Sequence, residues 1–206
     1  MDNIFDRYSK RYDAWYDKNK YAYLSELRAL KSVIPAKGKG LEIGVGTGRF
    51  AAPLGIETGI DPSEEMLKIA KSRGVDAHLG VGEALPFKNS TFDYVAIIIA
   101  LCFVKDPNKV IVESRRVLKR DGKIIIGIID KDSFLGKLYT TKKSVFYKEA
   151  KFFGPKEVFG MLKSLGFDGL SYIQTLFQDP GHIKAVDKPR KGCGAGGFVI
   201  VSGKKN

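Results

Sequence analysis

The chain of 206 residues is predicted to fold as one α/β domain, residues 1–206, built on a doubly wound parallel sheet. An apolar stretch ends at Ile43 and leads directly into Gly44-Val45-Gly46-Thr47-Gly48, the pattern of a buried strand followed by a tight turn. A second stretch of this kind ends at Gly59-Ile60-Asp61. The third observation is Phe92–Ile99, a nearly continuous apolar run that is typical of a central strand buried on both faces.

The chain begins with a predicted helical cap over residues 1–34. Aromatic residues in this segment recur at spacings of three and four, which places their rings on one helix face. They are Phe5, Tyr8, Tyr12, Trp15, Tyr16 and Tyr23. Such a cap can simply pack against the sheet, or it can also cover a ligand pocket, and the pattern is compatible with both.

Turn and capping residues predict the remaining elements. Pro53 and Gly55 limit the helix after the glycine turn to a short piece, and Ser63 is the predicted N-cap of the next helix. Segment 178–197, rich in Gly and Pro, is expected to be irregular, and the tail 204–206 to be frayed. Later helices are expected over about 106–118 and 155–166, and strands at about 40–44, 56–60, 75–79, 92–99, 123–129, 169–177 and 197–203.

The glycine turn and Asp61 together predict a site for a nucleotide-like ligand. Alternating glycines leave room for a ligand against the main chain, and a helix starting near Arg49 would direct free N–H groups toward it. Asp61 lies seventeen residues after Gly44, where its carboxylate can accept hydrogen bonds from both hydroxyls of a ribose. Glu42, just before the turn, would repel a pyrophosphate and suits a ligand with a cationic amino group.

Two other nucleotide motifs match less well. The dinucleotide fingerprint Gly-x-Gly-x-x-Gly requires a small residue where Arg49 stands, and here the third glycine comes one position early. An NAD(P)-dependent oxidoreductase is therefore a weaker alternative. The turn lacks the Gly-Lys-Ser/Thr ending of a phosphate-binding P-loop, which excludes that class.

Further short motifs occur in the order and spacing of one enzyme family. They are Glu42–Gly48, Asp61-Pro62-Ser63, Leu85-Pro86-Phe87, Phe92-Asp93 and Leu118–Lys123. On these motifs the chain resembles the class I S-adenosylmethionine-dependent methyltransferases of the type 11-like group, and is most similar to the branch with the ubiquinone and menaquinone biosynthesis methyltransferases. The resemblance runs from about Phe5 to Gly127 and is weaker toward the C-terminus. It implies a Rossmann-like sheet of seven strands, the last of them antiparallel.

The resemblance also implies S-adenosylmethionine as the cofactor, S-adenosylhomocysteine as its product, and a set of cofactor-binding residues. The glycines would shape the turn around the methionine part, the first acid would orient its amino group, and the second would hold the ribose. The residues after the third strand would lie near the adenine, and those after the fourth near the methyl group. The full set is Glu42, Gly44, Gly46, Gly48, Asp61, Pro62, Glu83, Ala84, Ala100 and Leu101.

Val81 is the clearest departure from the family pattern. Relatives usually have an acid at this position, where it approaches the adenine amino group. Without it, either Glu83 or main-chain groups of residues 81–84 would have to contact the adenine.

Segment 131–154 is a candidate substrate lid. It is longer and richer in aromatics than a connection between strands requires, although a packed surface helix would also explain it. Its expected place at the carboxyl end of the fifth strand favours a lid over the pocket. The residues expected to contact a methyl acceptor are Tyr8, Tyr12, Tyr16, Phe134 and Tyr139.

Composition limits the remaining function classes. The net charge of +12 is compatible with nucleic acid binding, but scattered lysines favour a solvated basic surface. Cys102 and Cys193 are too few for a disulfide framework, and with only His78 and His182 besides, no metal is expected. No apolar run has the length of a membrane span and no signal peptide is evident, so a cytoplasmic location is expected.

The resulting functional prediction is methyl transfer from S-adenosylmethionine to a small molecule. Residues 100–104 contain no acid or base, so no catalytic residue is assigned. For the same reason a non-catalytic S-adenosylmethionine-binding or assembly protein is an open alternative. These patterns leave open the acceptor, the atom that is methylated and the oligomeric state.

Overall fold

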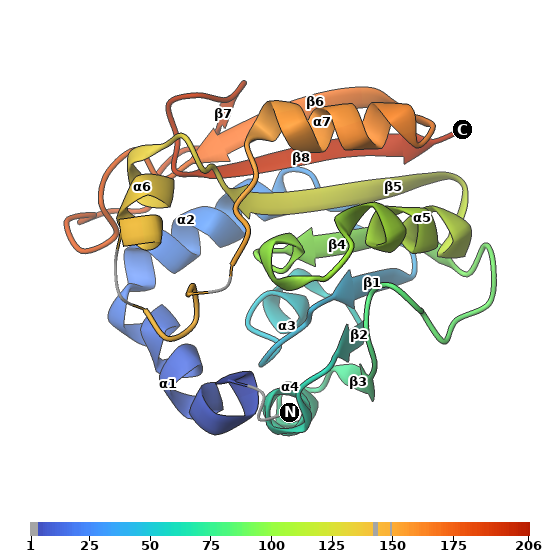
Figure 1. Ribbon diagram of the computed structural model, residues 1–206, viewed down its shortest axis with the longest axis horizontal. Helices are drawn as coiled ribbons and strands as arrows, with labels where there is room; N and C mark the ends of the chain where they lie inside the picture. Colours follow the sequence, from blue (N-terminus) through green and yellow to red (C-terminus); the bar gives the residue numbers. More distant parts are fainter. Residues whose placement is uncertain (1–3, 142–143, 149) are drawn as a thin grey trace.

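The computed structural model describes residues 4–141, 144–148 and 150–206, arranged around one eight-stranded sheet (Figure 1). The strands are β1 (Gly40–Ile43), β2 (Thr58–Asp61), β3 (Asp76–Leu79), β4 (Phe92–Ile98), β5 (Leu118–Ile129), β6 (Phe167–Thr175), β7 (Arg190–Lys191) and β8 (Phe198–Lys205). The helices are α1 (Ile4–Lys18), α2 (Lys20–Lys31), α3 (Ala51–Leu54), α4 (Glu64–Ser72), η1 (Leu101–Phe103), α5 (Pro107–Val117), α6 (Phe134–Thr141) and α7 (Pro155–Ser164).

The strand order is β3-β2-β1-β4-β5-β8-β6-β7, and the first five strands of this order are parallel. The chain builds outward from β1 to β3, then crosses to β4 on the other side of β1 and builds outward again. The order therefore reverses between β1 and β4, and the carboxyl ends of these two strands flank a topological switch point, where α/β sheets bind their ligands. This is the Rossmann-like, doubly wound arrangement expected.

The C-terminal half of the sheet confirms one expectation and corrects another. β8, the last strand, lies between β5 and β6 and is antiparallel to both. The sheet has eight strands and not seven, because two residues of the irregular segment 178–197 pair with the edge of β6 as β7. The side-chain oxygen of Gln174 in β6 fixes the segment after β7. It accepts hydrogen bonds from the main-chain N–H groups of Ala195 and Gly196 at 2.9 and 2.8 Å.

The expectation of a frayed tail was wrong. Lys204 and Lys205 belong to β8, where Lys204 is opposite Lys123 of β5 and Lys205 is opposite Phe167 of β6. The Lys205 ammonium also donates to the Leu118 carbonyl at 2.6 Å. Strand pairing on both sides therefore orders a stretch whose composition alone resembles a solvated tail.

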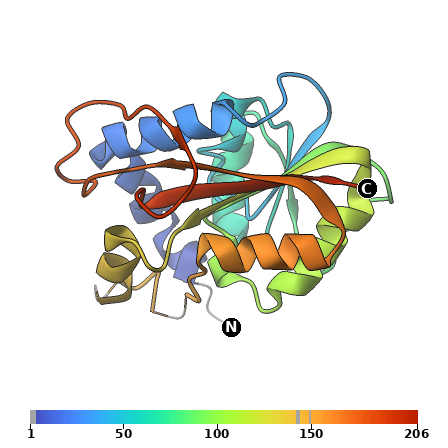
Figure 2. The ribbon, with the colours of Figure 1, turned by 90° about the horizontal axis from the view of Figure 1, so that it is seen from above.

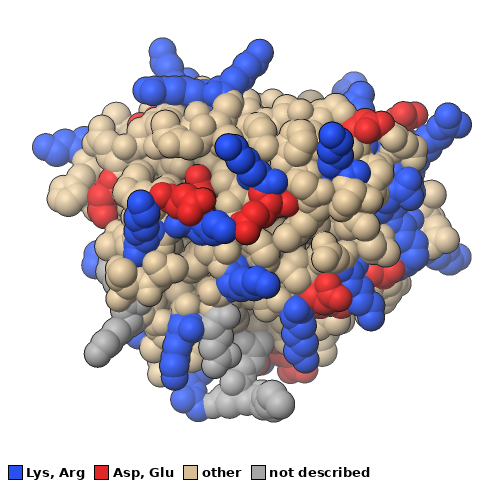
Figure 3. All heavy atoms as spheres, turned by 45° about the horizontal axis from the view of Figure 1, so that its top comes forward, with Lys and Arg blue, Asp and Glu red and all other residues tan. Residues whose placement is uncertain are grey.

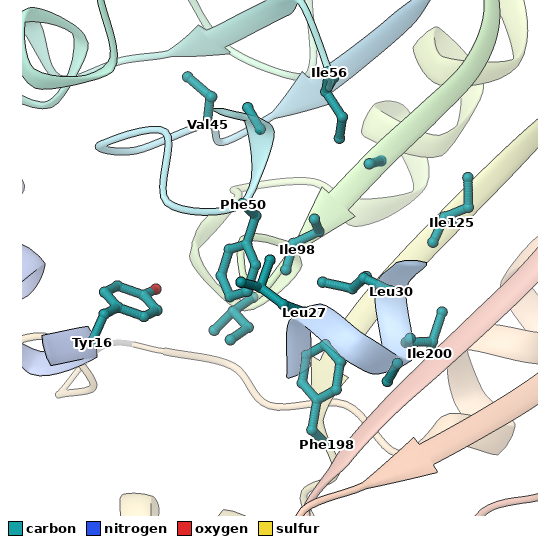
Figure 4. Packing of buried hydrophobic residues seen from close by; sticks show 14 of the residues in the cluster. Tyr16, Leu27, Leu30, Val45, Phe50, Ile56, Ile98, Ile125, Phe198 and Ile200 are labelled. Carbon is teal, nitrogen blue, oxygen red and sulfur yellow. The ribbon is translucent and has the colours of Figure 1, made fainter. Parts of the chain in front are cut away.

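Helices cover both faces of the sheet (Figure 2). Side chains of β4 alternate between the two, so that Ile98 joins the core beneath α2 and α3 while Ile97 joins the core beneath α5 and α7. Figure 4 shows Leu27 and Leu30 of α2 packed among side chains of the sheet and the loop before α3. Burial on both faces explains why the sequence of β4 is almost uninterrupted apolar.

Local signals for helix ends are confirmed. The Ser63 hydroxyl accepts the Met66 N–H at 3.2 Å as the N-cap of α4, and the Asp106 carboxylate accepts the Lys109 N–H at 3.1 Å at the start of α5. α3 has only four residues, and Gly55, whose φ of +69° is left-handed, caps its C-terminal end.

Helices α1 and α2 form the predicted cap. The Asp6 carboxylate accepts the Ser63 hydroxyl at 2.6 Å, and the Asp13 carboxylate accepts the Thr47 hydroxyl at 2.6 Å. α1 thus lies across the carboxyl ends of β1 and β2. In Figure 1 it is the blue helix at the side of the sheet toward which β4 points.

The surface is basic, with acidic residues interspersed. Figure 3 shows Lys and Arg side chains spread over one face, with Asp and Glu among them. Nucleic acid binding therefore stays a prediction. Among the helices of the described residues, none has both the length and the apolar character needed to cross a membrane.

Candidate active site

The three glycines of the loop after β1 all have left-handed backbone conformations, but the space around them differs. Their φ angles are +71° at Gly44, +51° at Gly46 and +76° at Gly48. A Cβ on Gly44 would collide with the Ala100 side chain, and one on Gly48 would lie 3.2 Å from the Ala70 Cα of α4. Nothing lies within 4 Å of a Cβ on Gly46. Only at the middle glycine would an added Cβ point into open space.

Asp61 ends β2 beside this loop. One carboxylate oxygen accepts the Gly46 N–H at 2.9 Å and the other accepts the Ser63 N–H at 2.9 Å. Burial raises the pKa of Asp61, and these two N–H groups oppose the shift. Each carboxylate oxygen can accept a second hydrogen bond, so the side chain can still bind a ligand.

A cavity of about 760 Å³ opens above Gly46 and Asp61 at the switch point. This volume lies within the usual range for small-molecule sites, about 300–1,000 Å³. The strand ends, the 80–83 turn and the segment after β4 form its walls, and α1 contributes two aromatic rings. Its lining includes Phe5, Tyr12, Gly44, Gly46, Asp61, Pro62, Gly80, Val81, Gly82, Glu83, Ile98, Ile99, Ala100, Phe103, Val104, Lys105, Asp106 and Lys109.

The structure brings about half of the predicted site residues to this cavity. Those that line it are Tyr12, Gly44, Gly46, Asp61, Pro62, Glu83 and Ala100. Those outside its lining are Tyr8, Tyr16, Glu42, Gly48, Ala84, Leu101, Phe134 and Tyr139. A motif or a helical period places a residue near the site, but it does not fix which of the neighbouring side chains faces the cavity.

Glu42 lies beneath the glycine loop with 1% of its surface exposed. Burial raises its pKa well above the usual value, the Asp61 charge adds to the shift, and a main-chain hydrogen bond from Ala51 opposes it. Its Oε2 has no hydrogen-bond partner among the described residues. The side chain is therefore close to the cavity floor without forming part of its lining.

Glu83 lines the cavity but is engaged in the protein. Its Oε1 accepts the main-chain N–H groups of Lys105 and Asp106 at 2.8 and 3.3 Å, which ties the 80–83 turn to the start of α5. Val81 also lines the cavity and is 44% exposed. Glu83 thus supports this wall through one carboxylate oxygen, and its contact with an adenine stays a prediction.

Aromatic rings of the cap close one side of the cavity. Phe5 meets Phe103 edge to face at 5.1 Å between ring centroids, and Tyr12 at 5.7 Å. In the predicted lid 131–154, residues 142–143 and 149 lie outside the described residues. Phe134 at the start of α6 is 37% exposed, whereas Tyr139 is buried and stacks on Tyr147 at 4.8 Å.

Sequence reasoning missed a charge cluster that fastens α1 to the glycine loop. The Asp13 carboxylate accepts hydrogen bonds from the guanidinium groups of Arg49 and Arg73, each at 2.8 Å, besides that from Thr47. Arg49 also pairs with Asp17 at 2.7 Å. Burial alone would raise the pKa of Asp13, but the hydrogen bonds from these three residues outweigh it and hold the pKa below its usual range. Arg49 therefore links both Asp13 and Asp17 of α1 to the glycine loop.

Comparison with known proteins identifies the family. Residues 41–126 match the family model described as a methyltransferase domain. The chain is 43% identical to an S-adenosylmethionine-dependent methyltransferase of Thermotoga maritima, described as a possible histamine N-methyltransferase. The crystal structure of that protein matches with a TM-score of 0.95, over 98% of each chain. The chain belongs to the S-adenosylmethionine-dependent methyltransferases.

Two further proteins are similar to this methyltransferase in sequence. It is 53% identical to an uncharacterized protein of Methanocaldococcus jannaschii over 205 residues, which are 98% of this chain and 99% of that one. It is 32% identical to a demethylmenaquinone methyltransferase of Thermotoga maritima over 153 residues, or 66% of each chain. The predicted family is thereby confirmed, whereas neither alternative function gains support.

The methyltransferase has cavity residues that the motifs did not single out. Lys105 and Lys109 come from the loop after η1 and from α5. Their position just after the carboxyl end of a central strand was the available signal. No group of three or more His, Cys, Asp or Glu side chains suited to a metal ion is found in the described part of the chain.

Proposed function

We propose that this methyltransferase acts on a small molecule that binds in the cavity next to the aromatic rings of α1. The observation behind this proposal is that one cavity extends from Gly46 and Asp61 to Phe5, Tyr12 and Phe103. Its polar floor suits the ribose and methionine parts of the cofactor, and its aromatic wall suits an acceptor of compact, largely apolar shape.

The residues present fit S-adenosylmethionine. Asp61 would accept hydrogen bonds from the ribose hydroxyls, and the open space at Gly46 would receive the methionine part. The buried carboxyl of Glu42 would assist the amino group, directly or through water. Val81 and Gly82 would contact the adenine through their main chain and through the Val81 side chain.

The bound cofactor supplies a methyl group that the sulfonium charge already activates, so the protein mainly has to hold the reactants in line. Ala100, two residues after β4, packs its Cβ against Gly44 of the glycine loop and also lines the cavity. Phe5 and Phe103 exclude water from the same end of the cavity. In this proposal the enzyme works by positioning and needs no acid or base in segment 100–104.

The relatives suggest two acceptor classes for testing. The Thermotoga maritima neighbour is described as a possible histamine N-methyltransferase, and another relative is a demethylmenaquinone methyltransferase. Amines and quinols should therefore both be included in a panel of small molecules, with RNA as a separate arm because the chain is basic.

Transfer of a labelled methyl group from S-adenosylmethionine to each panel member would test this function. We expect label in one small-molecule class and none in RNA. Calorimetry with S-adenosylhomocysteine would show independently that the cofactor site works. Cofactor binding without transfer to any panel member would favour the non-catalytic alternative, and label only in RNA would refute the small-molecule proposal.

A further inference from the structure

Two tyrosines of α1 share a single hydrogen bond between their hydroxyl groups. The oxygens of Tyr12 and Tyr16 are 2.9 Å apart, and either hydroxyl could be the donor at this distance. Among the described residues, each of these hydroxyls has only the other as a hydrogen-bond partner. A hydroxyl group has one proton to donate and two lone pairs that accept. The pair as a whole can therefore donate one more hydrogen bond.

Burial of the two residues decides the direction of their shared hydrogen bond. Tyr16 has 4% of its surface exposed and belongs to the core, where its ring contacts the rings of Tyr23 and Phe50. Tyr12 is half-buried and lines the cavity. An O–H group without a partner is costly in a protein core, whereas at a cavity it can meet a ligand or water. Tyr16 therefore donates to Tyr12, and the Tyr12 proton is left for a ligand.

Tyr12 acts as a hydrogen-bond donor and not as a base near neutral pH. Burial raises the pKa of its hydroxyl well above the ordinary value, so the group keeps its proton. The partner of this proton must carry a lone pair or a negative charge. A hydrogen bond to the atom that receives the methyl group would occupy the lone pair needed for attack. The favoured partner is therefore an oxygen that does not react.

Tyr12 is held beside the part of the cavity that is proposed to receive the methionine part of the cofactor. The next residue in the chain, Asp13, accepts a hydrogen bond from the Thr47 hydroxyl at 2.6 Å. Thr47 directly follows Gly46, where the glycine loop leaves open space. Tyr12 and Gly46 also line the same cavity. The contact between their neighbours thus fixes α1 next to the loop.

The cations around the cavity leave a carboxylate beside the glycine loop without a charged partner. Of the described residues in the lining, the cationic ones are Lys105 and Lys109, and both lie at the start of α5. Arg49 and Arg73 lie near the glycine loop, but their guanidinium groups bind Asp13, and neither is part of the lining. A neutral donor is therefore what this end of the cavity offers to an anion.

We propose that Tyr12 donates its hydroxyl proton to the carboxylate in the methionine part of the cofactor, and that Tyr16 is a positioning residue that sets the direction of this proton. The inference rests on the proposed function, which places the methionine part at Gly46. The carboxylate is the anionic group of S-adenosylmethionine, and a hydrogen bond to a charged oxygen is roughly twice as strong as one between neutral groups. The cap would then bind the cofactor as well as cover the acceptor.

Two ligands that differ only in this carboxylate would test the assignment. They are S-adenosylhomocysteine and its decarboxylated analogue, and calorimetry would measure the affinity of each for the full chain. We expect the wild type to prefer S-adenosylhomocysteine, and Tyr12→Phe to reduce this preference at least about tenfold by weakening S-adenosylhomocysteine alone. Tyr16→Phe should reduce the preference less. It should add nothing to Tyr12→Phe in the double variant, because Tyr16 acts through the Tyr12 hydroxyl.

Tyr172→Phe is the matched control. Tyr172 is a half-buried tyrosine of β6 that stacks on Phe159 and does not line the cavity, so this variant should keep the full preference. An equal loss of affinity for both ligands in Tyr12→Phe would indicate general damage to the cavity and would refute a contact with the carboxylate. No preference in the wild type, or the full preference in Tyr12→Phe, would refute it as well. An effect of Tyr16→Phe that persists in the double variant would refute the positioning role.

Methyl transfer to the panel of small molecules keeps this inference apart from the proposed function. A carboxylate preference that depends on Tyr12, without transfer to any panel member, would support the contact and contradict the proposed function. Transfer to a small molecule, together with an unchanged preference in Tyr12→Phe, would support the function and refute the contact.

Discussion

Glu26 should make the stability of the protein depend on pH in a way that one substitution removes. Its pKa rises from an ordinary value of 4.5 to about 8 in the folded chain because of burial. Between these two pH values the folded state holds a proton that the unfolded state has lost. The free energy of unfolding should therefore fall as the pH rises through this range and level off above about pH 8.

The size of this effect follows from the same two pKa values, 4.5 and about 8. At about 1.36 kcal/mol per pKa unit, the complete loss from Glu26 is about 5 kcal/mol, a large part of the stability of a typical domain. Glu26→Gln cannot ionise, so its unfolding free energy lacks this loss. Relative to the variant, the wild type should lose about 5 kcal/mol between pH 4 and pH 9.

Urea denaturation followed by circular dichroism at several pH values would measure this difference. The acids Glu42 and Asp61 also have raised pKa values, but they are present in both proteins and their effects cancel. The tyrosines near Glu26 have pKa values raised above 10 and do not titrate in this range. Glu64→Gln serves as the control. Parallel stability curves for wild type and Glu26→Gln would refute the reasoning.

Three further predictions concern the cofactor site and the cap. Asp61→Ala should weaken S-adenosylhomocysteine binding at least about tenfold in calorimetry, since each charge-assisted hydrogen bond contributes roughly 1.5–3 kcal/mol; an unchanged dissociation constant would remove Asp61 from the site. Asp13→Ala should lower the unfolding free energy by roughly 1.5–3 kcal/mol in urea denaturation, because Arg49 and Arg73 lose their shared carboxylate; a change near zero would mean that the cluster does not hold α1 in place. In hydrogen exchange, α1 and α6 should be less protected than the sheet and gain protection with S-adenosylhomocysteine, whereas equal protection in both states would mark them as ordinary packing.

The order of the elements followed directly from the sequence. The spacing of apolar residues and the length of apolar runs distinguished strands from helices. Ser63, Gly55 and Asp106 marked helix ends, because capping contacts join residues only a few positions apart. The glycine turn and Asp61 predicted the ligand-binding end of the sheet, because parallel strands bring their carboxyl ends to one edge. The short strand β7 and the paired lysines at the C-terminus were not predicted. Pairing with neighbouring strands orders these residues, and their own composition gives no sign of it.

What the sequence determined by itself was therefore the local part of the site: a strand, a sharp turn with room for a ligand, and an acid at the end of the next strand. Gly46 and Gly48 both have a positive φ, so the sequence cannot tell them apart. Only the tertiary structure decided that Gly46 faces open space while Gly48 packs against α4. It also decided the partners of the charged residues. Arg49 meets Asp13 across 36 positions of sequence, and Glu26 is buried with an oxygen that has no hydrogen-bond partner among the described residues. Contacts of this kind depend on how helices pack at one edge of the sheet, and no local pattern encodes that packing.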